Sequence, residues 1–422
     1  MKKLCNMSRE ELTERAAALQ AQYDAYCAQH LKLDMSRGKP GPEQLDLTMD
    51  LLAPITEVKT ENGIDVRNYG GVEGIPEARK LFGDILGVPA NQVIVGGNSS
   101  LNMMFDYIAT AYAMGVCGNT PWGKTENPKF LCPVPGYDRH FAITEYFGIE
   151  MVTVPMTASG PDMDEVERLV QDPSVKGMWC VPMYSNPDGI TYSDETVKRL
   201  AAMKTGAADF RIIWDNAYCL HHVYDTHDEL LNVYTECERC GNEDRVIMLC
   251  STSKISFPGA GVAALAASPA NIADILGRMT KQTIGFDKIN MLRHIAFFRD
   301  IDGVKEHMKL HAAILRPKFD VVLNTLQARL GDNGVATWHK PNGGYFISVN
   351  LMDGCAKETV RLLGEAGVVL TPAGSTYPHK QDPHDSNLRI APTFPTLSEL
   401  QTAIDLFCIA AELVCVQKLL AK

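Results

Sequence analysis

Five side chains with complementary chemistry lie at or just after apolar runs of this sequence. They are an amine, a carboxylate, a phenol, an amide and a guanidinium, contributed by Lys254, Asp215, Tyr218, Asn186 and Arg389. A lysine at the end of a buried strand must be neutralised, paired or used, because an unpaired buried ammonium is costly. Such a lysine can form a Schiff base with a carbonyl compound. The set therefore indicates chemistry on a carbonyl compound. It also supplies an acid, two hydrogen-bond donors and a guanidinium that can bind an anion.

The amine and the carboxylate are the groups on which this interpretation depends most. Lys254 lies in Ser251-Thr252-Ser253-Lys254-Ile255-Ser256, and Asp215 follows the apolar run 212–214. An acid in that place can keep a pyridine nitrogen protonated, which makes an aromatic ring an electron sink. Each signal also has an ordinary alternative. The lysine string fits a surface turn, and the aspartate fits a helix cap.

Two further residues, Tyr218 and Asn186, can donate to a phenolate oxygen. Tyr218 lies three residues after Asp215, and Asn186 follows an apolar run of its own. Core packing is the alternative for Tyr218, and a turn is the alternative for Asn186, because Asn-Pro is a turn signal. An amine, an acid and two such donors are what a protein needs to bind and use pyridoxal phosphate.

The stretch 96–100, Gly-Gly-Asn-Ser-Ser, is a candidate phosphate site. It follows the apolar run 93–95 and precedes a run that begins at Leu101. A glycine-rich turn that opens a helix presents N–H groups and the positive end of the helix dipole to a phosphate. Tyr137 can offer a flat face to a planar ring. Arg389 can bind a carboxylate with two parallel donors, although a structural salt bridge would also explain it.

These residues need a scaffold that brings strand ends together, and the pattern from about 70 to 300 predicts one. Short apolar runs alternate there with helical periods such as 162–171 and 193–204. This alternation predicts an α/β fold with a mainly parallel, seven-stranded sheet covered on both faces. Ligands of such sheets bind beyond the carboxyl ends of the strands. The expected strands lie in the runs 93–95, 130–132, 151–154, 178–181, 212–214, 246–249 and 262–267.

The flanking segments predict a second, smaller α+β domain. Ser8 and Glu11 form a capping box for a helix over 8–30, and residues 34–62 are expected to form an extended arm. The tail predicts a long helix over 305–330, strands at 344–349 and 388–391, and a last helix from Ser398. We therefore expect three parts: 1–62 as the N-terminal helix and arm of the small domain, 63–300 as the large cofactor-binding domain, and 301–422 as the small C-terminal domain.

Composition narrows the class of protein. The chain has 422 residues, of which 45% are hydrophobic and 22% charged, and its formal net charge is −11. The acidic balance argues against nucleic-acid binding, which needs a basic face. The apolar runs are too short for a membrane span, and none follows the first lysines as a signal peptide would, so neither is expected. The 12 cysteines are expected to be thiols in a cytoplasmic protein, with Cys237 and Cys240 as loop thiols rather than a zinc site.

The chain resembles the aspartate aminotransferase-like, fold type I pyridoxal phosphate enzymes. More narrowly, it resembles divergent bacterial aspartate aminotransferases whose sequences group with the MocR-type aminotransferase domain, and this likeness runs over nearly the whole chain. The strings that carry it are Ser36 to Pro40, Arg67 to Gly71, Cys132 to His140, Ser251 to Gly261 and Ala373 to Pro378. The resemblance implies the fold type I transferase fold, pyridoxal 5'-phosphate as cofactor and a cytoplasmic homodimer with shared active sites.

The resemblance also implies a role for each matching residue. Lys254 would form the Schiff base and then act as the acid and base of the 1,3-proton shift. Asp215 would hold the pyridinium, and Tyr137 would stack on the ring. The phenolate oxygen would meet Asn186 and Tyr218. Substrate binding would use Arg389, the backbone near Gly38, Asn186 and Arg37. The phosphate would be bound by Asn98, Ser99, Ser100, Ser251, Ser253 and, from the neighbouring subunit, Tyr69.

The chain departs from the family pattern at the position of a phosphate-binding arginine, and it offers several candidates for a second substrate-binding cation. The wider family has an arginine about eight residues after the lysine that pairs with the phosphate, whereas this chain has Val262 there. Arg67 is a candidate substitute. A dicarboxylic substrate also needs a second cation, for which the sequence offers Arg37, Lys39, Arg139 and Lys288.

We therefore expect a transaminase that moves the amino group of L-aspartate to 2-oxoglutarate and forms oxaloacetate and L-glutamate. Its expected partners are small amino acids and 2-oxo acids, and no metal is expected. The same cofactor serves β-lyases, decarboxylases and transaminases for aromatic or longer acidic substrates, so these alternatives stay open. A ligand-sensing regulator of the same fold is less consistent with the sequence, because about 30 residues before the arm are too few for a winged helix-turn-helix.

Overall fold

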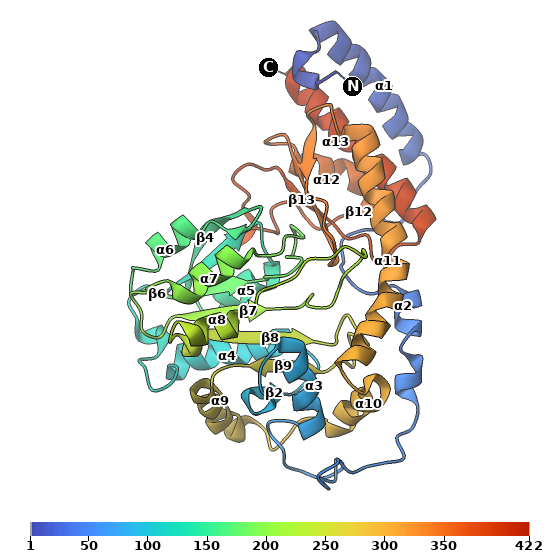
Figure 1. The fold of residues 1–422 in the computed structure, drawn as a ribbon. Helices are drawn as coiled ribbons and strands as arrows, with labels where there is room; N and C mark the ends of the chain where they lie inside the picture. Colours follow the sequence, from blue (N-terminus) through green and yellow to red (C-terminus); the bar gives the residue numbers. More distant parts are fainter. Residues whose placement is uncertain (1, 422) are drawn as a thin grey trace.

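The computed structural model describes residues 2–421, and its centre is a sheet of eight strands (Figure 1). The strand order is β2-β9-β8-β7-β6-β3-β4-β5, with parallel pairing from β8 to β4 and antiparallel pairing of β9 and β5. The predicted fold class is confirmed, and the short strand β5 is an addition to the seven expected. The strands are β2 (Val93–Val95), β3 (Lys129–Val134), β4 (Glu150–Thr157), β5 (Gly160–Pro161), β6 (Val175–Cys180), β7 (Arg211–Asp215), β8 (Val246–Ser251) and β9 (Ala263–Ala266).

Helices cover both faces of this sheet, which explains why most of its strands are continuous apolar runs, whereas β4 is largely exposed or half-buried. Ile212 and Trp214 of β7 pack with the helices of one face, and Ile213 packs with those of the other. The first face carries α3 (Pro76–Leu86), α6 (Met163–Leu169), α7 (Asp194–Ala202), α8 (Val233–Arg239) and α10 (Lys288–Phe298). The second face carries α4 (Ser100–Met114), α5 (Asp138–Tyr146) and α9 (Pro269–Gln282).

A second, smaller unit is built on the antiparallel sheet β10-β11-β13. Its strands are β10 (Ala336–Trp338), β11 (Ile347–Leu351) and β13 (Asn387–Ile390). Helices α1 (Arg9–Cys27) and α11 (Ile301–Leu330) both pack against α13 (Leu397–Leu420), and α12 (Ala356–Glu365) joins the same core. In Figure 1, α11 runs from beside the large sheet up to the small unit. We infer that the boundary between the two units lies near residue 300, where α11 begins.

The N-terminal region agrees with its prediction only in part. The capping box is present, since Ser8 accepts a hydrogen bond from Glu11 N and α1 begins at Arg9. The predicted arm over 34–62 is wrong as a purely extended segment. Strand β1 (Leu33–Asp34) pairs with β12 (Val368–Val369), and the helix α2 (Pro42–Asp46) follows it. Short 3-10 helices occupy Leu4–Asn6, Met49–Leu52, Ala90–Gln92, Trp122–Lys124, Glu243–Arg245 and Pro378–Lys380.

Two other local predictions need correction. The strand expected from residue 344 begins only at Ile347, because Gly344 has a φ of +80°, a left-handed conformation that interrupts a strand. Cys237 and Cys240 are not loop thiols, because Cys237 is buried within α8 and Cys240 caps that helix. All twelve cysteines are free thiols. In the part of the chain from residue 2 to residue 421, no helix has the length and apolar character needed to cross a bilayer.

Candidate active site

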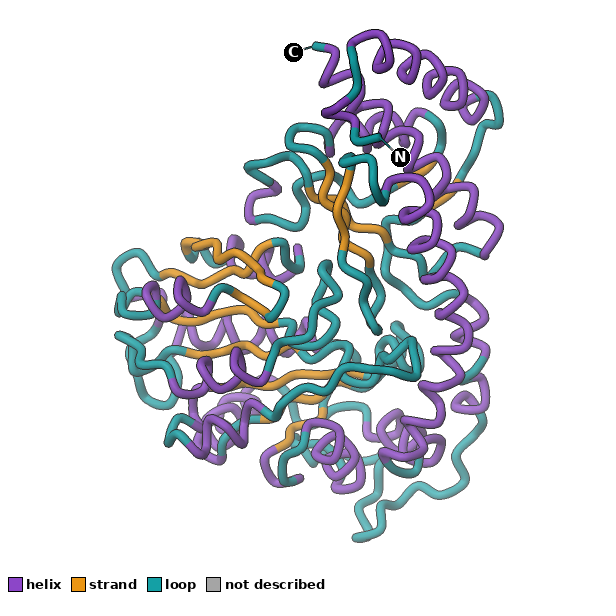
Figure 2. Tube along the Cα trace, turned by 45° about the horizontal axis from the view of Figure 1, so that its top comes forward, coloured by secondary structure: helices purple, strands orange, loops and turns teal. Residues whose placement is uncertain are grey.

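The predicted residues meet where the strands of the large sheet end. Strand β7 ends at Asp215, and its neighbour β8 ends at Ser251. The turn 96–100 leaves β2, which is separated from β8 by β9. Ser253 Oγ donates to Asn98 O at 3.1 Å and so joins the lysine turn to this glycine-rich turn. Figure 2 shows the loops of the large sheet gathered between that sheet, the small sheet and α11.

Asp215 has one oxygen held and one oxygen free. Its Oδ2 lies 3.0 Å from His140 Nε2, and both side chains are buried. An ionised carboxylate only accepts hydrogen bonds, so His140 Nε2 carries the proton of this contact. His140 is fixed in turn by Trp179, whose ring stacks on it at 4.3 Å with an interplanar angle of 8°. Asp215 Oδ1 is buried and has no hydrogen-bond partner among residues 2–421, so it is an acceptor awaiting a donor.

Lys254 and Tyr218 lie side by side near this carboxylate. Lys254 Nζ is 4.6 Å from the centre of the Tyr218 ring. Burial is the main reason that the pKa of the Tyr218 phenol is raised above its ordinary value. Tyr218 is therefore a neutral hydroxyl near pH 7, able to donate a hydrogen bond to an anionic oxygen. The structure thus brings together the amine, the acid and one of the two donors predicted from sequence.

The candidate phosphate residues form one polar rim. Ser251 Oγ donates to Ser253 Oγ at 3.1 Å, and Asn98 Nδ2 donates to Gly259 O at 3.3 Å. Ser99 is the N-cap of α4 and Ser100 is its first residue, and the Ser99 side chain makes no capping hydrogen bond. The hydroxyls and N–H groups at this helix start suit an anion. Val262, in the place of the family's arginine, is buried, and its N–H donates to Thr252 Oγ1 at 2.9 Å.

Arg389 is a buried guanidinium with uncharged hydrogen-bond partners. Its Nη1 donates to Asn186 Oδ1 and its Nη2 to Thr371 Oγ1, both at 3.1 Å. Its Nε is buried and has no partner in the described chain, and Asp138 Oδ1 lies 3.8 Å from Nη1, too far for a hydrogen bond. Because arginine only donates, its contact fixes the Asn186 amide with the oxygen toward Arg389 and leaves Nδ2 to donate elsewhere. Among residues 2–421, Arg389 is therefore a buried cation with no anionic hydrogen-bond partner and with a donor still unpaired, which suits it to bind a carboxylate.

The segment around Gly38 reaches Arg389 through Phe346. The Arg389 guanidinium lies 4.6 Å from the Phe346 ring centre, and a Cβ at Gly38 would come within 2.2 Å of the same ring. Any side chain at Gly38 would therefore displace Phe346. Thr371 Oγ1, which accepts from Arg389, donates to Ser36 O at 2.8 Å. The backbone of 36–38 is thus linked to the guanidinium through two intermediates, Thr371 and Phe346.

These residues fit pyridoxal phosphate. The free Asp215 Oδ1 matches a protonated ring nitrogen, and the rim of Ser251, Ser253 and Asn98 matches a phosphate. The neutral phenol of Tyr218 matches the ring's anionic oxygen, and Lys254 Nζ beside it matches a carbonyl carbon. Each need of the cofactor meets a group of the right chemistry.

Comparison with known proteins agrees with this arrangement. The sequence pattern of the aspartate amino-transferase family matches residues 7–422. The chain belongs to the aspartate aminotransferase family. The predicted family is therefore confirmed.

Individual relatives of this family place the chain more narrowly. The aspartate aminotransferase of Corynebacterium glutamicum is 48% identical over 390 residues, which cover 92% of this chain and 90% of that protein. The crystal structure of an aspartate transaminase from Corynebacterium glutamicum matches with a TM-score of 0.96, 45% identity and 99% coverage of both chains. LysN, the α-aminoadipate aminotransferase of Thermus thermophilus, was solved with N-(5'-phosphopyridoxyl)-L-leucine. It matches with a TM-score of 0.72, 20% identity and coverage of 96% and 98%, a likeness in fold.

Other predicted residues of this aspartate aminotransferase-family chain lie at the edge of the site. Tyr137 precedes α5, packs edge-on against His140 at 4.9 Å, and has its pKa raised to about 12 by burial. Tyr69 is 83% exposed. Arg67 makes a two-pronged contact with Asp65 and is mostly exposed, so it is not drawn toward the serine rim. No contact among the described residues therefore supports Arg67 as the replacement for the missing phosphate-binding arginine.

The structure places only some of the candidates for the second cation near the Arg389 site. Arg37 and Lys39 flank Gly38, and Lys39 Nζ lies 3.8 Å from the centre of the Phe394 ring. Arg139 lines a cavity with Phe105 and Tyr146, on the α4 side of α5. Lys288 is buried and donates to Gly70 O at 2.8 Å. Arg37 and Lys39 are therefore the two that share a segment with the Arg389 site.

Sequence reasoning missed several residues that shape this aminotransferase-family site. His140, Trp179, Thr371 and Phe346 were assigned no role, although each touches Asp215 or Arg389 directly or through one neighbour. His140 had a usable signal, because it lies in the same string Cys132 to His140 as Tyr137, three residues after it. Thr371 and Phe346 had none, since only the fold brings them to Arg389.

Proposed function

We propose that this chain is a pyridoxal phosphate-dependent aspartate aminotransferase, which transfers the amino group of L-aspartate to 2-oxoglutarate. The observation that carries the proposal is the free, buried Oδ1 of Asp215, because it needs a donor such as a protonated ring nitrogen. The aspartate specificity is supported by the 48% identical relative. We also propose a cytoplasmic location, since all twelve cysteines are thiols and a reducing compartment preserves thiols.

The site residues divide the work of the reaction between binding and proton transfer. When bound, pyridoxal phosphate supplies an electron sink for the negative charge that develops at the substrate Cα. Asp215 Oδ1 would keep a proton on the ring nitrogen, and His140 holds Asp215 in orientation. Tyr218 and Asn186 Nδ2 would donate to the phenolate oxygen. Lys254 Nζ would take the proton from the substrate Cα and would deliver it to the carbon that was the carbonyl carbon of the cofactor.

Arg389 orients the amino acid for this proton transfer. Its unpaired Nε–H, together with an N–H of a neighbouring Nη, can bind the α-carboxylate with two parallel hydrogen bonds. Phe346 packs on the face of the guanidinium and Thr371 fixes one Nη, so the cation has little freedom to turn away. Among the candidates for the side-chain carboxylate, we propose Arg37, because it adjoins Gly38 and the other neighbour of Gly38, Lys39, has its Nζ over the Phe394 ring.

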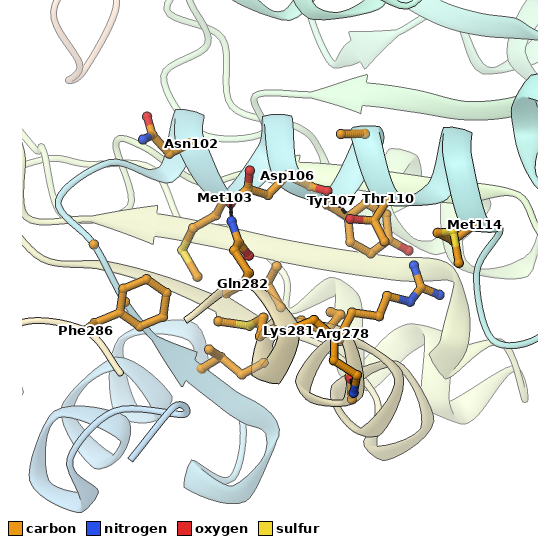
Figure 3. Close-up of a pocket in the computed structure, with 18 residues that line it drawn as sticks. Asn102, Met103, Asp106, Tyr107, Thr110, Met114, Arg278, Lys281, Gln282 and Phe286 are labelled. Atoms are coloured by element: carbon orange, nitrogen blue, oxygen red, sulfur yellow. Dashed lines mark hydrogen bonds between the residues drawn. The ribbon is translucent and has the colours of Figure 1, made fainter. Parts of the chain in front are cut away.

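The dimer is a further part of the proposal, supported by exposed residues at one side of the large unit. Tyr69 is 83% exposed, and Ile284 and Met114 are 63% and 69% exposed. A cavity of about 690 Å³ runs between α4 and α9, from Gly96 of the phosphate turn to Met114, and is lined mainly by apolar atoms (Figure 3). Exposed apolar surface of this kind marks an interface. We propose that a second copy covers this surface and that its Tyr69 contributes to the phosphate rim.

Mixing two inactive variants tests this sharing of residues. In a mixed dimer of Lys254→Ala and Tyr69→Ala subunits, one site would contain Lys254 and Tyr69 from different subunits, both intact. Random mixing should therefore recover about a quarter of wild-type turnover, because half of the dimers are mixed and each has one intact site. Turnover is measured after unfolding and refolding the subunits together, with each variant refolded alone as the control. Failure to gain activity on mixing would show that Tyr69 serves its own subunit or neither.

The reaction itself is tested by the visible absorbance of the purified protein. With pyridoxal phosphate added, a band should form, be lost on addition of L-aspartate alone, and return on addition of 2-oxoglutarate. A lyase or decarboxylase would instead turn over L-aspartate without a 2-oxo acid. A band that ignores L-aspartate but responds to an aromatic or longer acidic amino acid would keep the cofactor and change the substrate.

A further inference from the structure

A chain of buried polar side chains contacts the main chain of the turn that carries Lys254. It is built from elements outside the large sheet: Gln44 on α2, His307 and His311 on α11, and Tyr345, which precedes β11. Gln44, His311 and Tyr345 have no measurable exposure, and His307 is 7% exposed. Buried polar groups of this kind are costly unless they are paired, so their partners show what they do.

The partners of this chain are the main-chain carbonyls of the lysine turn. Tyr345 Oη donates to Lys254 O at 3.4 Å, and His307 Nε2 lies 3.0 Å from Ile255 O. Two successive carbonyls, one of them belonging to the lysine itself, are thus contacted by side chains of the small unit and of α11. The hydroxyl contact is long for an O–H donor, so it is sensitive to any shift of Tyr345.

Gln44 determines which way the Tyr345 hydroxyl points. Gln44 Oε1 accepts from Gly41 N at 3.1 Å, so its Nε2 is the atom that lies 3.0 Å from both Tyr345 Oη and His311 Nδ1. The amide donates to both. Tyr345 Oη is therefore already an acceptor, and its own proton is directed to Lys254 O. Burial lowers the pKa of His311 to about 4, which is consistent with a neutral ring that accepts at Nδ1.

Tyr345 also faces the amine of the same lysine. Lys254 Nζ lies 5.9 Å from the centre of the Tyr345 ring and 4.6 Å from that of Tyr218, and the two rings are 6.1 Å apart. Both rings are within the range in which an aromatic face attracts a cation. Tyr345 thus contacts the lysine at its main chain and limits the space available to its side chain.

We propose that Tyr345, with its hydroxyl oriented by Gln44, is a positioning residue for Lys254. Its role is to fix the lysine turn so that Nζ stays aligned for proton transfer at the substrate Cα. The inference rests on the proposed function, because it assumes that Lys254 transfers this proton. Displacement of a catalytic group by about 1 Å can cost about 100-fold in rate, so a modest loosening of the turn should be measurable.

The test compares Tyr345→Phe with Tyr23→Phe. Tyr23 is a matched control, because it is buried in the small unit and its hydroxyl also donates to a main-chain carbonyl, Leu362 O at 2.8 Å. Tyr345→Phe should lower kcat about tenfold, with KM changed less than about twofold, since the substrate contacts of Arg389 are intact. It should also weaken the affinity for pyridoxal phosphate, measured by absorbance titration of the cofactor-free protein. Tyr23→Phe should lower the Tm and leave both quantities unchanged.

A double-mutant cycle tests the part played by Gln44. If the amide acts on Lys254 through the Tyr345 hydroxyl, Gln44→Met should lower kcat in the wild type but change it little in the Tyr345→Phe background. Full additivity of the two changes would contradict this route. The inference is overturned if folded Tyr345→Phe keeps wild-type kcat and cofactor affinity, or if Tyr23→Phe loses as much kcat. Failure of the wild type to bind pyridoxal phosphate would overturn the proposed function instead.

Discussion

Replacing Lys254 by alanine should abolish amino-group transfer from L-aspartate to 2-oxoglutarate. The expected loss in kcat is at least about 10⁴-fold, the upper range for removal of a positioned proton-transfer group. The physical reason is that the variant has neither the amine that binds the carbonyl carbon nor a base near the substrate Cα. Tyr218, whose ring centre lies 4.6 Å from Nζ, cannot replace it, because burial raises its pKa and keeps its proton in place. The measurement is oxaloacetate formation at saturating substrates.

A buried lysine outside the site provides the control for this experiment. Lys176 on β6 is 9% exposed, and its Nζ lies 2.9 Å from Asp209 Oδ1. Lys176→Ala also leaves a buried charge unpaired, so it should lower the Tm, but its folded fraction should keep the wild-type kcat. Lys254→Ala with turnover within tenfold of wild type would remove the lysine from the mechanism, whatever its effect on the fold.

Replacing Asp215 by asparagine should give the second largest effect, a fall in kcat of about 10² to 10³-fold. Asparagine has almost the same shape and can keep a contact with His140, but it has no negative charge. The ring nitrogen would then lose the anion that keeps it protonated, and with it much of the power to accept electrons from the substrate Cα. Binding of pyridoxal phosphate should weaken less than kcat falls, because the serine rim and Lys254 are unchanged. Both quantities are measured on the same preparation.

Asp209→Asn is the matched control for this change. Asp209 is also buried, precedes the same strand β7 and carries a charge contact with Lys176, but it lies at the opposite end of the strand. Its replacement should lower the Tm and leave kcat of the folded protein unchanged. Equal losses of kcat in the two variants would mean that the Asp215 effect comes from the fold. Retained kcat in Asp215→Asn would mean that the ring nitrogen does not depend on this acid.

The scaffold could be predicted from sequence because its signals are local. Six of the seven runs are continuous, apolar and fully buried, since a strand covered by helices is buried on both faces. The run 151–154 in β4 is the exception, because it contains Thr153 and is largely exposed or half-buried. The start of α1 was equally readable, because the capping box of Ser8 and Glu11 is a contact between residues three apart. The helix ends at Cys27, earlier than the predicted residue 30. The positions of Asp215 and Lys254 followed, since the carboxyl ends of adjacent parallel strands must meet at one edge of the sheet.

The arm over 34–62 was predicted less well for a related reason. Its glycines, prolines and acids indicate an extended chain, and no local pattern shows that β1 would pair with β12. Helix α2 is five residues long, too short to give a periodic signal. The tertiary fold nevertheless places Gln44 of this helix against Tyr345, at a sequence separation of 301 residues.

By itself, the sequence determined the fold class, which depends on periodicity along the chain, and the family, which depends on specific strings of residues, and it predicted the reactive side chains from residue type. Only the tertiary structure decided which partner each group has. His140 reaches Asp215 across 75 residues, Asn186 reaches Arg389 across 203, and Tyr345 reaches the Lys254 carbonyl across 91. Such contacts depend on how helices and sheets pack, and side-chain packing is a property of the whole core that no local stretch of sequence encodes.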